Sequence, residues 1–265
     1  MRVVVLGGTG VVGRHVVEQA VAQGHDVVVA SRRGTPPPGV AGVTGAQVDA
    51  ATGVGLEAAF AGAQVVVDTS NASVGRAEGA RRRFTTMADH VSRAAAAAGV
   101  GRVVLISIVG IDDIPYGYYQ GKVAQELAYR AGHSPVTVVR TTQFHEFAGQ
   151  VLARVPMVPV VGVPRMRVQP VAAAEVATAL LAAADGPYRE REPDLAGPEV
   201  HELGDLVRAL LKAKGSRAKV LSVPIPGRGG RMMASGSLLP KGGRRGMTTF
   251  DAWLAASKSP VTPPD

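Results

Sequence analysis

The residues best suited to chemistry lie in the segment VVLISIVGIDDIPYGYYQGKVAQE, at positions 103–126. Ser107 closes an apolar run of strand length, so we expect its hydroxyl at the carboxyl edge of a sheet. Tyr118 and Lys122 are four residues apart at the start of a helical stretch, and so share one face. A tyrosine can protonate the alkoxide formed from a carbonyl, a nearby ammonium lowers the pKa of that tyrosine, and a serine can hold the carbonyl. This set predicts carbonyl reduction.

Two neighbouring tyrosines leave the identity of the proton donor open. Tyr119 is three residues before Lys122 and competes with Tyr118, and Tyr116 lies in the loop before the helix. Each of them could instead form only a wall of the substrate pocket. Tyr119 is therefore also a candidate substrate contact.

A second chemical motif stands at the start of the chain, where Gly7, Gly10 and Gly13 lie between an apolar run and a helical stretch. The first glycine permits a tight turn, the second lets a pyrophosphate approach the backbone, and the third lets the helix pack on the strand. The phosphates then meet the positive end of the helix dipole. The cofactor contacts expected in this turn are Gly7, Thr9, Gly10, Val11, Val12 and Gly13.

The stretch VVVASRRG predicts which dinucleotide is bound. Proteins that select NAD usually place an acidic residue after the second strand, but this chain has Ser31, Arg32 and Arg33 there. A guanidinium binds phosphate bidentately and can stack on adenine. We therefore expect NADP(H) rather than NAD, with Arg32 as the main contact and Arg33 as either a second contact or a solvated loop residue.

Further cofactor contacts follow from residues that come after other strands. Asp49 follows the third strand and is expected to accept a hydrogen bond from the adenine amino group. Thr69, Ser70 and Asn71 follow the run VVVD and are expected to border the middle of the cofactor. Lys122 is expected to hold the nicotinamide ribose as well as to act on the tyrosine.

The elements that must position these residues alternate between strands and helices. Five runs are apolar throughout, which is typical of strands buried on both faces of a parallel sheet: residues 3–6, 27–30, 65–68, 103–108 and 136–140. Helical stretches separate them, at residues 11–23, 56–61, 77–98 and 118–131. This order predicts the α/β class with a doubly wound parallel sheet.

The pattern changes after about residue 150, where prolines at 156, 159, 164 and 170 break any long helix. We expect residues 1–150 to form a dinucleotide-binding domain. Residues 151–265 are expected to form a small mixed C-terminal substrate lobe, discontinuous with the first domain. The glycine-rich stretch GRGGRMMASGSLLPKGGRRG is expected to be a loop.

Composition and charge restrict the class of protein further. The formal charge is +8, and residues 201–265 hold eleven Lys or Arg against four Asp or Glu. Without aromatic interleaving or a known DNA-binding motif, we expect no nucleic acid partner. The sequence has no apolar stretch long enough for a spanning helix, no cysteine and no HExxH spacing among six histidines, so we expect no membrane, disulfide or metal and a cytoplasmic location.

Five stretches carry a family resemblance: GGTGVVGRHVV, ASRRG, SIVGID, YYQGK and VVRTTQFHEF. They resemble the atypical branch of the short-chain dehydrogenase/reductase superfamily, which includes NmrA-like proteins and isoflavone reductases. The resemblance covers residues 1–225 and implies a Rossmann fold and an NAD(P)-dependent oxidoreductase using Ser107, Tyr118 and Lys122. It also implies that residues 142–147 border the substrate, with Phe144 and His145 as candidate contacts.

Three functions fit the resemblance. The first is an NADPH-dependent reductase of a small or medium-sized hydrophobic carbonyl or enone, acting as a monomer or homodimer. The second is an NmrA-like redox sensor that binds the dinucleotide and signals through a protein partner without turnover. The third, an NAD-dependent epimerase or dehydratase, is disfavoured because the C-terminal lobe is short.

Overall fold

The computed structural model describes residues 1–72, 77–154 and 159–257, and the chain divides into two compact units. The first consists of Met1–Thr141 and Ala173–Asp194, and the second of Thr142–Ala172 and Leu195–Asp265. This division differs from the expected boundary at residue 150. The reason is that helix α6 (Ala173–Asp185) packs against α1 (Val11–Ala22) of the first unit.

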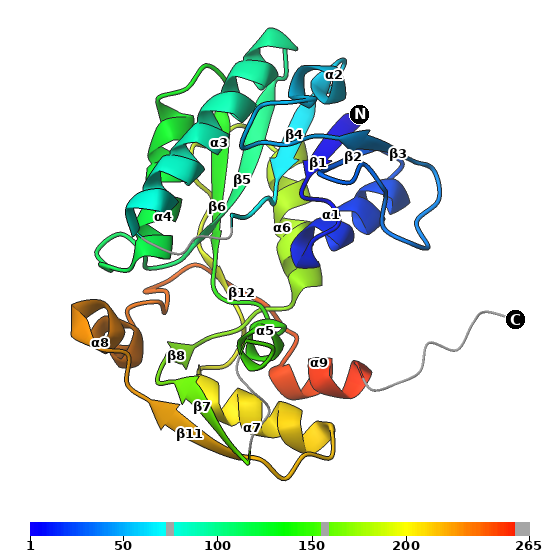
Figure 1. Ribbon diagram of the computed structural model, residues 1–265. Coiled ribbons are helices and arrows are strands. Elements are labelled where there is room, and N and C mark those ends of the chain that lie inside the picture. Colours follow the sequence, from blue (N-terminus) through cyan, green and yellow to red (C-terminus); the bar gives the residue numbers. More distant parts are fainter. Residues whose placement is uncertain (73–76, 155–158, 258–265) are drawn as a thin grey trace, which may run out of the picture. The chain divides into compact units, whose positions relative to one another are not determined.

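The first unit is built on a parallel sheet whose strands run in the order β6-β5-β4-β1-β2-β3. These strands are β1 (Arg2–Leu6), β2 (Asp26–Ser31), β3 (Val43–Gln47), β4 (Val65–Asp68), β5 (Arg102–Ile108) and β6 (Val136–Thr141). The winding direction reverses between β1 and β4, which is where ligands bind in open α/β sheets. The predicted Rossmann-type α/β fold is confirmed (Figure 1).

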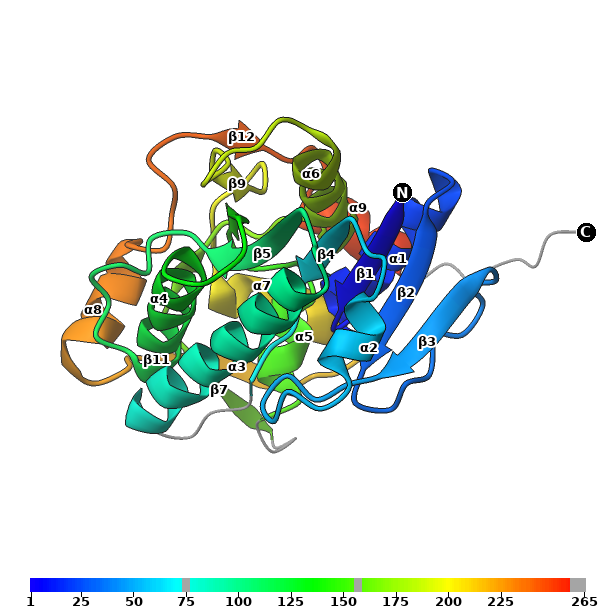
Figure 2. The same ribbon diagram turned by 90° about the horizontal axis from the view of Figure 1, so that it is seen from above.

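Helices cover both faces of this sheet. Figure 2 shows α3 (Ala77–Ala97) and α4 (Gly117–Arg130) on one face and α6 on the other. The short helix α2 (Leu56–Phe60) packs against α3. Phe60, Phe84, Leu105 and Tyr129 are fully buried in the core between the sheet and these helices. The valine-rich strands belong there because both of their faces are removed from water.

The second unit combines short strand pairs with helices. Strand β7 (Val160–Pro164) pairs in parallel with β11 (Lys219–Val223), β8 (Arg167–Val168) pairs antiparallel with β10 (His201–Glu202), and β9 (Leu195–Ala196) pairs in parallel with β12 (Arg244–Arg245). Its helices are α5 (Phe147–Leu152), α7 (Leu203–Ala213), α8 (Gly227–Ser235) and α9 (Phe250–Ala256).

Helix α8 corrects one expectation, because it forms within the glycine-rich stretch that we expected to be a loop. A Cβ atom on Gly230 would collide with the carbonyl oxygen of Ile225. The absence of a side chain there lets the helix pack against the chain that leads into it. In this position glycine serves close packing rather than flexibility.

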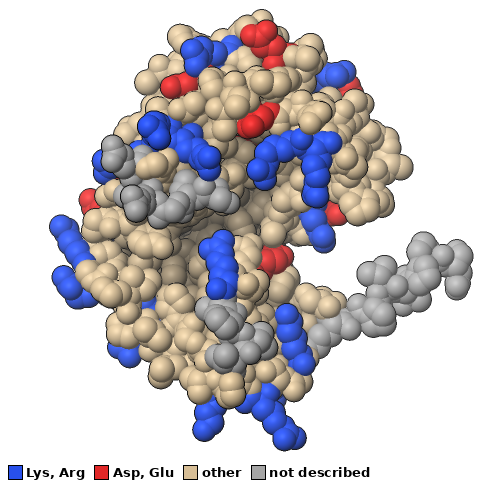
Figure 3. Space-filling model, in the orientation of Figure 1, with Lys and Arg blue, Asp and Glu red and all other residues tan. Residues whose placement is uncertain are grey.

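In the part of the chain that the structure describes, no helix has both the length and the apolar character needed to cross a bilayer. Across those same residues, His, Asp and Glu form no group of three or more that could hold a metal ion. Figure 3 shows Lys and Arg spread over the visible face rather than gathered in one patch.

Candidate functional site

The glycine turn between β1 and α1 has the close contacts that require glycine. Gly7 has φ of 79°, a left-handed conformation that side chains rarely adopt, and a Cβ there would lie 3.0 Å from the backbone of Ser70. The Gly10 amide donates to the Gly7 carbonyl at 2.9 Å and closes the turn. The turn is therefore held against the loop that follows β4.

Gly13 brings α1 close to this turn. A Cβ on Gly13 would collide with the Gly7 carbonyl oxygen and would lie 2.7 Å from Thr69 Oγ1. Gly10 is the N-cap residue of α1 and has no side chain that could accept a hydrogen bond from the first amides of the helix. Thr9 and Gly10 are exposed, whereas Val11 is half-buried and Val12 is buried. The backbone of this turn, rather than its side chains, is therefore suited to hold a diphosphate.

The loop after β4 supplies the second wall. Thr69 donates from both its amide and its hydroxyl to the Leu6 carbonyl, each at 2.9 Å. Ser70 donates its amide to Asp68 Oδ1 at 2.8 Å, and its buried hydroxyl has no hydrogen-bond partner among the described residues. A buried polar atom without a partner is unusual and fits a ligand beside the turn. The glycine turn and the Ser70 hydroxyl both fit a bound dinucleotide.

The residues expected to contact the adenosine half lie after β2 and β3. Ser31 is buried and its hydroxyl accepts from the Gly34 amide at 3.1 Å. Arg32 and Arg33 are exposed, and within the described chain neither guanidinium forms a hydrogen bond or ion pair. Asp49 Oδ1 accepts from the Ala51 amide at 2.9 Å, which orders the turn after β3. The two arginines are thus available to an external anion.

Tyr118 lies beside the loop that follows β4. Its hydroxyl donates to Asn71 Oδ1 at 3.2 Å, and its ring packs edge-on against Phe84 and Tyr119, with centroids 5.9 and 5.7 Å away. Tyr119 is buried, and burial together with the adjacent tyrosines raises its pKa well above the usual range. Tyr116 is exposed and its ring centroid is 5.5 Å from that of Tyr119. Of these tyrosines, Tyr118 is the one placed next to a predicted cofactor residue.

Lys122 is buried, with an exposed fraction of 3%. Its ammonium donates to the Ile106 carbonyl at 2.9 Å and to Gln125 Oε1 at 2.6 Å, and it lies 5.4 Å from the centre of the Phe84 ring. Burial lowers the pKa of Lys122 to about 8, against the opposing effect of Asp68 and Glu126. The structure therefore holds this ammonium between β5 and its own helix.

Ser107 lies at the carboxyl end of β5, as its place in the sequence predicts, but its hydroxyl is bound by another protein group. It is 2% exposed and donates its hydroxyl to Glu126 Oε1. Glu126 in turn accepts two hydrogen bonds from Arg140, from Nε to Oε1 and from Nη2 to Oε2, both at 2.8 Å. The members of the expected set thus have different hydrogen-bond partners: the hydroxyl of Tyr118 bonds to the loop after β4, whereas that of Ser107 belongs to a buried ionic cluster.

Asp68 is a site residue that the sequence reasoning did not select. It is 1% exposed at the end of β4 and accepts from the Tyr129 hydroxyl at 2.6 Å as well as from the Ser70 amide. Burial and the adjacent Asp68 carboxylate raise the pKa of Tyr129. Asp68 therefore fixes the start of the loop that carries Ser70 and Asn71. The signal was present, since a carboxylate closes the otherwise apolar run VVVD.

Phe144 and His145 lie in the second unit. His145 is 1% exposed, its Nε2 is 3.0 Å from the Thr248 carbonyl oxygen, and its ring packs against Phe250 and Trp253. Phe144 is half-buried and forms a bridge with Val171. The surroundings of His145 are those of a core residue of this unit.

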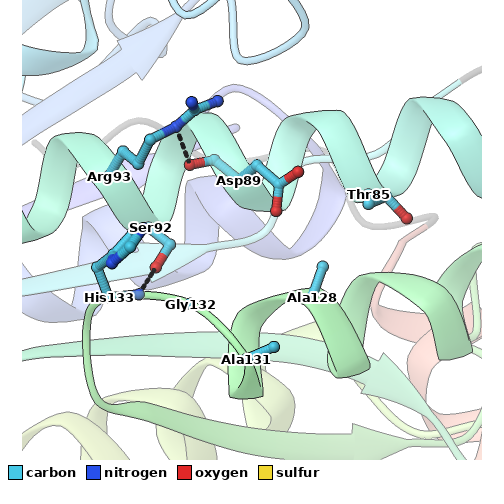
Figure 4. A pocket seen from close by; sticks show the side chains of 8 residues that line it. All are labelled: Thr85, Asp89, Ser92, Arg93, Ala128, Ala131, Gly132 and His133. Atoms are coloured by element: carbon cyan, nitrogen blue, oxygen red, sulfur yellow. Dashed lines mark hydrogen bonds between the residues drawn. The ribbon is translucent and has the colours of Figure 1, made fainter.

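A cavity of about 380 Å³ lies elsewhere, between α3 and the end of α4 (Figure 4). Two of its polar side chains bond within the protein: Ser92 Oγ accepts from the His133 amide at 2.8 Å, and Arg93 Nε donates to the Asp89 carbonyl at 3.3 Å. The residues that line it are Thr85, Asp89, Ser92, Arg93, Ala128, Ala131, Gly132 and His133. None of the expected site residues is among them, so the candidate site is the carboxyl edge of β1, β4 and β5.

Comparison with known proteins identifies the family of the chain. A family model described as NAD(P)H-binding matches residues 7–187. No curated protein matches the sequence significantly.

Several solved structures share the fold. A UDP-glucose 4-epimerase from Bifidobacterium longum, in complex with NAD+ and UDP, is similar with a TM-score of 0.75 at 14% identity, covering 97% of each chain. A nucleoside-diphosphate-sugar epimerase from Staphylococcus aureus has a TM-score of 0.71 at 17% identity, covering 96% of this chain and 99% of that one. A short-chain dehydrogenase/reductase superfamily protein from Agrobacterium tumefaciens with bound NAD has a TM-score of 0.68 at 19% identity, covering 97% and 96%. At these identities the likeness shows the fold, and with the family match it confirms the resemblance to this superfamily.

Proposed function

Because the chain belongs to the NAD(P)H-binding family, we propose that it is an NADP(H)-dependent oxidoreductase that reduces a small or medium-sized hydrophobic carbonyl or enone. The observation that carries the proposal is the position of Tyr118, whose hydroxyl lies 3.2 Å from Asn71 in the loop packed against the glycine turn. A phenol at that place is suited to protonate an oxygen that gains charge during reduction.

The residues for the cofactor come from three loops of the first unit. The backbone of the turn from Gly7 to Gly13 would hold the diphosphate, and the partnerless hydroxyl of Ser70 would add a hydrogen bond. Arg32 would bind the 2′-phosphate, because its guanidinium is exposed and no acidic residue follows β2. When bound, the reduced nicotinamide supplies the hydride.

The other members of the expected set take supporting roles. Lys122 lies 5.4 Å from the centre of the Phe84 ring, against which Tyr118 also packs, and burial lowers its pKa to about 8, so its role is a positive charge behind this aromatic cluster at pH values below about 8. The hydroxyl of Ser107 is bound to Glu126, so its role is to hold that carboxylate rather than to bind the substrate carbonyl. Tyr119 is a wall of the site, since its burial and raised pKa disfavour proton exchange with solvent.

A second candidate function is a dinucleotide-dependent sensor without turnover. One observation favours it: the hydroxyl of Ser107 and the ammonium of Lys122 both bond to buried protein groups. A protein that only binds and reports the dinucleotide needs neither group in contact with a substrate. An epimerase is the third candidate, because two of the similar solved structures are sugar-nucleotide epimerases.

The test is oxidation of NADPH in the presence of a panel of ketones, quinones and enones. Loss of the phenol in Tyr118→Phe should lower kcat about 10²-fold or more, because general acid catalysis contributes on that scale, and should leave NADPH affinity unchanged. Tyr188→Phe is the matched control, since Tyr188 is exposed and lies against Arg102 away from this edge. Binding of NADPH without turnover of any compound in the panel would favour the sensor instead.

A further inference from the structure

The buried ionic cluster around Arg140 lies at the carboxyl ends of β5 and β6. The Arg140 side chain is 4% exposed, and all three of its guanidinium nitrogens donate hydrogen bonds. Nε and Nη2 reach Glu126, while Nη1 and Nη2 reach the two oxygens of Asp112 at 2.6 and 2.7 Å. One guanidinium therefore binds two carboxylates in fork geometry, the strongest arrangement for such a pair.

One of these two carboxylates lies in the helix that carries Tyr118, and the other lies in the segment that leads into that helix. Glu126 is in α4, four residues beyond Lys122, and receives the hydroxyl of Ser107 from β5. Asp112 is in segment 109–116, which connects β5 to the start of α4. Arg140 thus ties the helix that carries Tyr118 to the segment that leads into it.

The two partners of Arg140 differ in their exposure to water. The Glu126 side chain is 2% exposed, whereas that of Asp112 is 58% exposed. A buried charge pair cannot open without leaving an uncompensated charge, but an exposed carboxylate can exchange its partner for water. The hydrogen bonds from Arg140 lower the pKa of Asp112, with a further contribution from Arg191. Glu126 is therefore the permanent anchor, and Asp112 is the contact that can open.

Segment 109–116 is also fixed by two buried side chains and a backbone hydrogen bond. Ile111 and Ile114 are buried, and the Tyr116 amide donates to the Ile114 carbonyl at 2.7 Å. Asp112 lies between the two isoleucines and six residues before Tyr118. A shift at Asp112 is therefore transmitted along a short, tightly turned stretch to the first turn of α4.

We propose that the Asp112–Arg140 ion pair is a latch that positions segment 109–116, and through it the hydroxyl of Tyr118, at the cofactor edge of the sheet. Asp112 and Arg140 are positioning residues for the proposed reduction, so the catalytic part of this inference rests on the proposed function. The structural part, that the latch sets the environment of Tyr118, stands without it.

The test compares Asp112→Asn with Asp113→Asn. Asparagine keeps the size of the side chain but loses the charge and the bidentate acceptance. Asp113 is the neighbouring exposed aspartate, and among the described residues it forms no hydrogen bond or ion pair. The probe is tyrosine-labelled protein observed by NMR, in which Tyr118→Phe assigns the signal of Tyr118 among the five tyrosines. Hydrogen exchange of amides 109–118 is measured on the same samples.

In Asp112→Asn we expect the Tyr118 ring signals to shift and the amides of 109–118 to exchange about tenfold faster, while Asp113→Asn behaves as wild type. On the substrate panel, kcat should fall about tenfold in Asp112→Asn at unchanged NADPH affinity, and Asp112→Glu should recover part of the lost kcat.

Unchanged Tyr118 signals and unchanged amide exchange in Asp112→Asn would overturn the latch. Altered signals with unchanged kcat in an active enzyme would overturn the positioning role. A wild-type protein that binds no NADPH would refute the proposed function, and the NMR and exchange readouts would still decide the latch.

Discussion

Lys122 carries its ammonium where water is excluded. Its hydrogen bonds to the Ile106 carbonyl and Gln125 satisfy the charged form, yet burial dominates and brings its pKa to about 8. The side chain is therefore mostly charged at pH 7 and mostly neutral at pH 9. The charge state of this one residue changes in a range that is accessible to experiment.

This shift predicts a pH-dependent stability. The folded-state pKa of Lys122 is below that of the unfolded chain, near 10.5, so between pH 8 and 10 the unfolded state binds more protons than the folded state. The free energy of unfolding should therefore rise across that range, by up to about 3 kcal/mol. Above pH 10 the raised pKa values of Tyr119 and Tyr129 act in the opposite direction.

Urea unfolding at several pH values checks this prediction. The variant Lys122→Met should lose the rise between pH 8 and 10, whereas Lys219→Met, at an exposed position, should keep it. If Lys122→Met retains the full pH dependence of the wild type, the buried ammonium is not its source.

Individual residues were predictable where their role depends on local sequence. Gly7, Gly10 and Gly13 were identified from their spacing and their place between an apolar run and a helical stretch, and the structure places them in the turn between β1 and α1. The partner of Ser107 was not predictable in this way. Glu126 and Arg140 are 19 and 33 positions away in the sequence, and their meeting depends on how α4 packs on β5 and β6. A strand end that is polar in the sequence can therefore face inward.

At the scale of elements, the junction between β1 and α1 depends on the glycine in the first turn of the helix. Gly13→Ala would place a methyl group against the Gly7 carbonyl and Thr69 Oγ1. Relieving that collision must move the turn or the helix, which should cost about 1–3 kcal/mol of stability and weaken dinucleotide binding.

Gly79→Ala is the matched control for this change. Gly79 is also helical, but a Cβ there meets nothing within 4 Å. Alanine at this position should be neutral or should stabilise the protein by about 0.5–1 kcal/mol. Thermal unfolding and NADPH titration of both variants check the prediction. Equal effects from the two substitutions would show that close packing at Gly13 is not required.

The strands and helices of the first unit were largely predictable, because long apolar runs and amphipathic stretches are local signals. Helix α8 was not, since glycine usually disfavours a helix and the contact between Gly230 and Ile225 that calls for it is visible only in the structure. The unit to which α6 belongs was not predictable either. Its apolar pattern fits a buried helix in either unit, and the sequence does not say which surface it covers.

At the scale of the whole molecule, the chain passes between the two units more than once, because each unit consists of two separate stretches of sequence. The first contains the glycine turn, the exposed arginines and the aromatic cluster around Tyr118, so all groups assigned to the cofactor come from one compact body. The basic residues of 201–265 belong to the second unit and its C-terminal stretch. The proposed preference for NADP(H) therefore rests on Arg32 and its neighbour, not on the net charge of the protein.

Calorimetric titration of the full-length protein with NADPH and with NADH tests the central claim most directly. The account predicts saturable binding of both, with NADPH bound about tenfold or more tightly because a guanidinium pairs with its extra phosphate. It further predicts that Arg32→Ala weakens NADPH much more than NADH and nearly removes the difference. Absence of binding for either dinucleotide would contradict the assignment of the site, and equal affinities that respond equally to Arg32→Ala would contradict the role of the arginine.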